Sequence, residues 1–65
     1  MVDDTEVIEA MQKYGGYFVQ NLGRAAAHAD PVNLAKIKVT WPKYWEEYTE
    51  FAEMDLSRQQ HSEGD

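Results

Sequence analysis

Apolar side chains recur every three or four residues along most of this chain, the spacing of helices that bury one face. The pattern is densest between Trp41 and Leu56, where the apolar positions fall within an arc of roughly 140° on a helical wheel. So much aromatic surface must be buried, either inside the molecule or against a partner. The apolar side consists of Trp41, Tyr44, Trp45, Tyr48, Phe51, Ala52 and Leu56, and the opposite side carries Glu46, Glu50 and Glu53.

The amino-terminal half predicts one long helix from about Thr5 to His28. Asp4 or Thr5 can cap its start, where acidic residues suit the positive end of the helix dipole. Its apolar positions keep one helical phase through Gly15-Gly16, so we expect a bend there at most. A break is the alternative, since each glycine in a helix interior costs about 1 kcal/mol relative to alanine. The stripe consists of Val7, Met11, Tyr14, Phe18, Leu22 and Ala25.

Two prolines mark the starts of two further helices. Asp30-Pro31 supplies an N-cap and a first-turn proline, and predicts a short helix over Pro31–Val39. Trp41-Pro42 opens a third helix that runs to about residue 56, and the polar tail at 57–65 is predicted to be disordered. We therefore expect a single all-α domain at 1–56 with a long, a short and a medium helix, the first packing against the third.

Length and composition restrict the class of protein. A chain of 65 residues forms one domain with a thin margin of stability, and its eight aromatic residues compensate for its size. The absence of cysteine argues against disulfides and against a cysteine-based zinc site. No apolar run reaches the roughly 20 residues that a membrane span needs, and the acidic start is unlike a secretory signal or a transit peptide. These features predict a cytoplasmic protein.

The net charge of −6 is unevenly distributed. Residues 1–9 carry four acids and no base, residues 10–45 have a net charge of +4, and residues 46–65 have a net charge of −6. The overall charge disfavours non-specific binding to nucleic acid or to anionic lipid, and favours a basic protein partner.

Small residues on the first predicted helix form a candidate packing face. Gly16 and Gly23 lie within about 20° of each other on the wheel, with Ala27 adjacent. Such a face can admit the third helix or another subunit, and together with Tyr17 we expect it to form the self-contact of a homodimer. The alternative is that Gly15-Gly16 only interrupts the helix and that Gly23 is incidental.

The polar side of the third helix is a candidate surface for a protein partner. Glu46, Glu47, Glu50 and Glu53 face outward, where they can dock on a basic protein or mimic the phosphates of DNA. The alternative is an ordinary solvated helix face, since small acidic proteins need such residues for solubility.

Three lysines suggest a competing function. Lys36, Lys38 and Lys43 lie around Trp41 and Tyr44, and basic groups interleaved with aromatic rings can bind single-stranded nucleic acid. The alternative, which the negative net charge favours, places the two rings in the core and the lysines in water.

No residue pattern predicts catalysis, a metal site or a cofactor. His28 lies near the end of the first helix, where a capping role suits it, and His61 lies in the tail. Carboxylate pairs such as Glu46 and Glu50 share a helix face but have no desolvated cleft between them. We therefore expect that the protein is not an enzyme.

Beyond the periodicity, a set of positions within about residues 8–52 forms a recognisable pattern: Met11-Gln12-Lys13-Tyr14-Gly15-Gly16, Phe18, Leu22, Ala29-Asp30, Asn33, Lys36 and Trp41-Pro42-Lys43-Tyr44-Trp45. The pattern resembles a group of small helical proteins of tailed phages and prophages. The resemblance implies an accessory protein that binds a host or defence protein, and it transfers no catalytic residue. The sequence thus predicts a homodimeric, non-enzymatic interaction module. A nucleic-acid-binding protein and a small subunit of a larger assembly are the alternatives.

Overall fold

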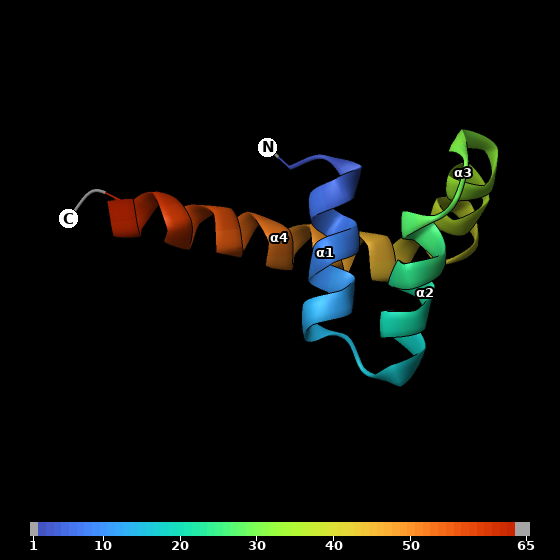
Figure 1. The fold of residues 1–65 in the computed structure, drawn as a ribbon, viewed down its shortest axis with the longest axis horizontal. Helices are drawn as coiled ribbons and strands as arrows, with labels where there is room; N and C mark the ends of the chain where they lie inside the picture. The colour runs from blue at the N-terminus through green and yellow to red at the C-terminus, as the bar shows by residue number, and fades with distance from the viewer. Residues whose placement is uncertain (1, 64–65) are drawn as a thin grey trace.

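The computed structural model describes residues 2–63, and the side chains of residues 2–58. Four helices follow one another through short turns: α1 (Asp4–Tyr14), α2 (Tyr17–Ala27), α3 (Pro31–Thr40) and α4 (Pro42–Glu63). The first two helices lie side by side as a hairpin, α4 crosses α1, and α3 lies near the start of α4 (Figure 1). The residues described contain no strand, which confirms the predicted all-α class. None of these helices is both long and apolar enough to cross a membrane.

The prediction of one continuous helix over Thr5–His28 is wrong at the glycine pair. Gly15 and Gly16 are extended, with φ, ψ of −76°, 158° and −73°, −172°, and the chain reverses there. The side-chain amide of Gln20 donates a hydrogen bond of 2.9 Å to the Gly15 carbonyl, which ties the turn to the first turn of α2. The alternative of a break is therefore the observed one.

Close packing, and not an unusual backbone angle, makes glycine necessary at position 15. A Cβ atom placed there would lie 2.6 Å from the Met11 carbonyl oxygen and 2.7 Å from the Cβ of Val19. A Cβ atom at Gly16 would meet no heavy atom within 4 Å. Only the first glycine is thus required by the close approach of the two helices.

The starts of α1 and α3 follow the sequence more closely, whereas the end of α4 does not. Asp3, one residue before the predicted caps, accepts a hydrogen bond of 3.0 Å from the Glu6 backbone N–H in a capping box. Asp30 caps α3 as predicted, accepting a bond of 2.8 Å from the Asn33 N–H. The last helix continues past the predicted end near residue 56, so the backbone of 57–63, predicted to be disordered, is helical; residues 64–65 lie outside the described part.

The core lies where α1, α2 and α4 meet. Met11 has no exposed surface, and Tyr48 is the one buried aromatic residue among those described. Around them, Trp45 and Phe51 are half-buried, so the predicted aromatic side of the last helix does face the interior. The core cluster consists of Val7, Ala10, Met11, Val19, Leu22, Tyr48 and Ala52.

Ring contacts join α4 to both arms of the hairpin. On α1, Tyr14 stacks on Phe51 with the ring centroids 5.1 Å apart. On α2, the Phe18 ring lies edge-on to Trp41, the C-cap residue of α3, and is tilted against Tyr44 of α4, with ring centroids 5.9 Å apart in both pairs. Such pairs contribute about 0.5–1.5 kcal/mol beyond their buried area. The predicted packing of the first helix against the last is thus confirmed.

A polar contact adds to the rings where α1 ends. The Asp55 carboxylate accepts hydrogen bonds from the Tyr14 hydroxyl and from the Lys13 ammonium, the latter at 3.3 Å. The bond from Tyr14, and then the bond and charge of Lys13, hold the pKa of Asp55 below its ordinary value of 3.8. Tyr14 and Asp55 in turn raise the pKa of Lys13 above 10.5. The charged form of the carboxylate therefore favours the folded state.

We expect Gly15→Ala to destabilise the protein by more than Gly16→Ala, whose effect is limited to the weaker N-cap that alanine provides for α2. The added methyl at position 15 must displace a backbone oxygen and a core valine, and such overpacking costs about 1–3 kcal/mol. Urea denaturation followed by circular dichroism measures both free energies of unfolding. Equal stabilities of the two variants would contradict the turn described here.

Acid should weaken the wild type more than Asp55→Asn. Because the folded-state pKa of Asp55 is depressed, its stabilising effect is complete above pH 3.8 and is lost as the pH falls through the lower, folded-state pKa. Thermal unfolding between pH 2 and pH 7 should show this loss in the wild type and a flatter profile in the variant. As a control, Glu53→Gln removes an exposed carboxylate of the same helix and should leave the wild-type acid dependence in place.

Candidate functional site

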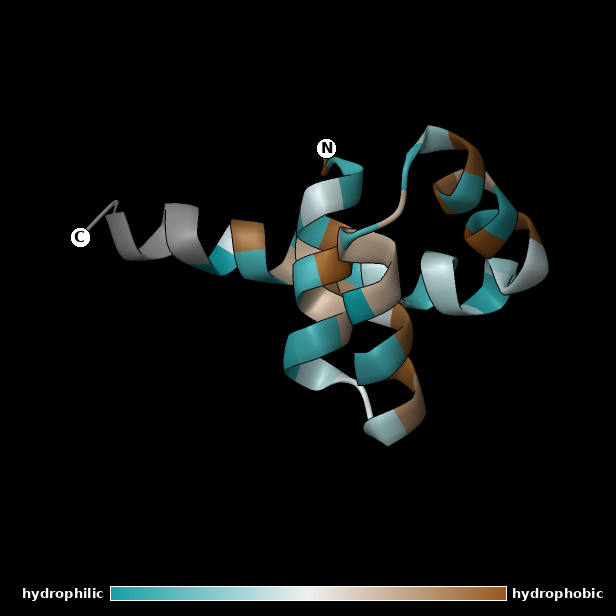
Figure 2. Ribbon diagram, turned by 45° about the vertical axis from the view of Figure 1, so that its right-hand side comes forward, coloured by the Kyte–Doolittle hydropathy of each residue, from teal (hydrophilic) through white to brown (hydrophobic). Residues whose placement is uncertain are grey.

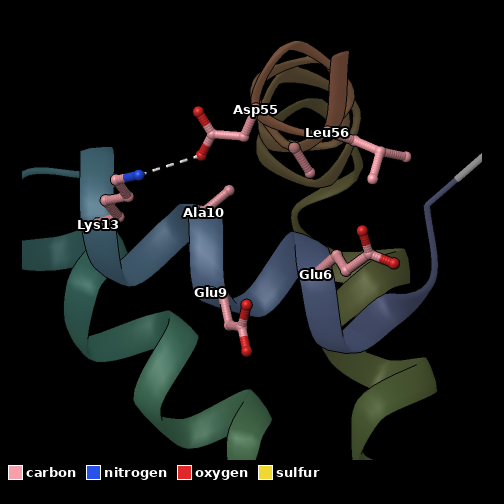
Figure 3. A pocket seen from close by; sticks show the side chains of 7 residues that line it. Glu6, Glu9, Ala10, Lys13, Asp55 and Leu56 are labelled. Carbon is pink, nitrogen blue, oxygen red and sulfur yellow. Dashed lines mark hydrogen bonds and ion pairs between the residues drawn. The ribbon is translucent and has the colours of Figure 1, made fainter. Parts of the chain in front are cut away.

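A small pocket between α1 and α4 holds several charged residues. Glu6, Glu9, Lys13 and Asp55 line it with Ala10 and Leu56 (Figure 3). The Lys13–Asp55 ion pair uses two of the charges, and the Glu6 and Glu9 side chains point away from that pair. The carboxylates therefore do not converge on a space that a substrate could occupy. The Lys13–Asp55 ion pair connects α1 to α4, and Glu6 and Glu9 do not pair with either residue.

The described residues also contain no cluster of three or more His, Cys, Asp or Glu side chains that could hold a metal ion. His28 is exposed at the C-cap of α2, near the position expected for a capping residue. The side chain of His61 lies outside the described residues. His28, the histidine whose side chain the structure describes, is therefore exposed at a helix end.

The three residues predicted for self-association do not share one open face. Gly16 and Tyr17 are exposed at the start of α2, and the Tyr17 side chain is 89% exposed. Gly23 is instead buried, and a Cβ atom built on it would lie 3.0 Å from the Cβ of Met11. The missing side chain at position 23 therefore serves the packing of α2 on α1. Neither the last helix nor a second subunit is needed to explain it.

The predicted acidic surface does face outward. Glu46, Glu47, Glu50 and Glu53 are all exposed along α4. Lys43 joins the first three in lining a shallow groove. Their position agrees with a partner surface and equally with a solvated helix face, so position alone assigns them no role.

The three lysines do not assemble into a patch around an open ring. Lys38 makes an ion pair of 3.2 Å with Asp4 and lies 5.5 Å from the centre of the Trp45 ring, so it joins α3 to α1 and α4. Trp41 is half-buried, with its ring against Phe18. Of the three lysines, Lys43 lines a groove together with Trp41 and Tyr44, as the prediction requires, whereas Lys36 and Lys38 line grooves of α3.

The sequence analysis did not predict that the outer side of α3 is apolar and exposed. Six of its ten residues are apolar, yet none is buried. Ile37 packs against the core, but Val32 is 65% exposed and Val39 is 79% exposed. Figure 2 shows hydrophobic segments along this helix, at the outer end of the molecule. An entire helix is thus left with one apolar side in contact with water.

We call this outer side the α3 face and define it by Pro31, Val32, Ala35 and Val39. A groove lined by these residues, Lys36 and Thr40 runs along it. The sequence does contain its signal, because residues 32, 35 and 39 are spaced by three and four. That spacing is a second helical stripe beside the one formed by Leu34 and Ile37.

Comparison with known proteins adds no assignment to this geometry. The chain matches no protein-family model, no curated protein and no solved structure. The resemblance to small phage proteins therefore stays a prediction of the sequence.

Proposed function

We propose that this protein is a non-enzymatic interaction module that binds another protein through the α3 face. The observation that carries the proposal is the absence of any buried residue on α3, although six of its ten residues are apolar. Fully burying a valine side chain contributes about 1.5 kcal/mol or more. Val32 and Val39 leave most of that stabilisation unused in the isolated chain, and a partner that covers them gains it.

The position of the helix supports the same proposal. Asp30 caps α3, and the Lys38–Asp4 ion pair connects it to α1 while Ile37 faces the core. The helix is therefore held in place from its inner side, and the outer side is presented without having to fold on binding. Such preorganisation lowers the entropic cost of association.

Two other predictions from the sequence remain proposals of lower standing. A homodimer would now rest on the exposed Tyr17, because Gly23 is enclosed within the chain. A role as a phage-type accessory protein of the cytoplasm, acting on a host or defence protein, rests on the sequence alone. The acidic residues Glu46, Glu47, Glu50 and Glu53 would then set the electrostatic surroundings of the contact.

The proposal requires that the α3 face contribute little to folding. We expect the double variant Val32→Ser, Val39→Ser to keep the wild-type free energy of unfolding within about 0.5 kcal/mol, as is usual for exposed positions. Chemical denaturation measures this quantity, and Met11→Ala, expected to lose about 2–5 kcal/mol, is the buried reference. A large loss in the double variant would show that the face packs within the protein.

A photo-reactive amino acid at position 39 should crosslink to a defined protein in cells of the native host. The same group at position 54 is the matched control, since Met54 is an apolar residue, 51% exposed, on another helix. The adduct formed at position 39 should disappear when Val32 is changed to Ser, and no such adduct should form at position 54. Identical adducts at both positions, or none at position 39, would refute the proposal.

A further inference from the structure

The α3 face has a ridge with a groove on each side, the surface shape through which helices pack on one another. Pro31, Ala35 and Val39, spaced four residues apart, line two grooves at once. They therefore form a ridge with a groove on each side. One groove continues to Val32, Lys36 and Thr40, and the other to Leu34, Lys38 and Asp4.

Ridges of residues four apart are the elements that interdigitate in the commonest class of helix pairs, which cross at about −50°. The ridge on α3 is low, because proline, alanine and valine are small, and Ala35 lies at its middle. A low ridge lets a second helix approach closely and place its own ridge in either groove. The shape thus favours a helix as the occupant over a loop or an extended strand.

The charges around the ridge select the kind of helix. Residues 31–43 contain three lysines and no acidic residue. Within the described residues, Lys38 is paired with Asp4, while Lys36 makes no ion pair and stands exposed beside the groove. Lys43 lines neither groove of the ridge, since it lies in the first turn of α4 beside Glu46 and Glu47. The groove on the Val32 side is therefore bordered by the charge of Lys36, and the groove on the Leu34 side is bordered by the neutral Lys38–Asp4 pair.

We propose that the occupant of the α3 face is an amphipathic helix of a partner protein that carries Asp or Glu beside its apolar ridge, on the side that meets Lys36. The proposal rests on the function proposed above and names the partner of the same surface. A second copy of this chain fits less well. Pairing two α3 helices about Ala35 would bring Lys36 of each copy near the other, and like charges at an interface oppose association.

Selection from a displayed peptide library tests the proposal. The library presents one helical scaffold with a fixed Ala/Val ridge and flanking positions randomised among Asp, Glu, Lys, Arg, Ser and Gln. Binders are selected on the full-length wild type and, in parallel, on Lys36→Glu and on the matched control Arg24→Glu, which reverses an exposed charge on α2. Counter-selection on Val32→Asp, Val39→Asp removes peptides that bind elsewhere.

The wild type and Arg24→Glu should enrich peptides with acidic flanks. Lys36→Glu should bind those peptides roughly tenfold more weakly, because the reversed charge repels the acidic side chains of the peptide. Enrichment of neutral or basic flanks would overturn the acidic helix while leaving the α3 face as a docking site. A dimer that competes with the peptides, seen by light scattering and lost on Val39→Asp, would assign the face to a second copy. Failure to enrich any peptide that needs Val32 and Val39 would overturn the proposed function itself.

Discussion

The close approach of α1 and α2 at Gly15 is the constraint on which the rest of this structure depends. There is no room for a Cβ atom between the Met11 carbonyl and Val19, so the chain can reverse within two residues only with glycine at that position. The reversal turns the apolar sides of two short helices toward α4, whose Phe51 contacts α1 and whose Tyr44 contacts α2. The turn at Gly15 thus allows α1, α2 and α4 to share one core.

The helical class, the starts of α3 and α4 and the inward side of α4 could be predicted because local chemistry encodes them. Asp30-Pro31 caps one helix, and the aromatic spacing reports a buried side. The reversal could not be predicted in the same way. A stripe that keeps its phase through Gly15 and Gly16 suits a straight helix, and it equally suits two helices folded face to face. The choice between them depends on contacts between α1 and α2, such as Met11 with Val19 at Gly15, that periodicity does not contain.

The candidate site was missed for a related reason. The apolar residues of α3 are distributed around two sides, with Leu34 and Ile37 inward and Val32 and Val39 outward, so no single side stands out. The pattern shows that two apolar sides exist, but only the arrangement of neighbours shows which one the molecule covers. Gly23 was predicted to contact another subunit, but the space beside it is filled by Met11 of the same chain.

One side of α3 packs on the core and the other is exposed, and this arrangement has an evolutionary consequence. Since none of its ten side chains belongs to the buried interior, substitutions at the outward positions leave the hairpin and its aromatic contacts undisturbed. If the α3 face binds a partner as proposed, selection can alter what it binds without compensating changes elsewhere. A lineage under pressure from a changing target could exchange these residues freely, while the turn at Gly15 would have to be kept.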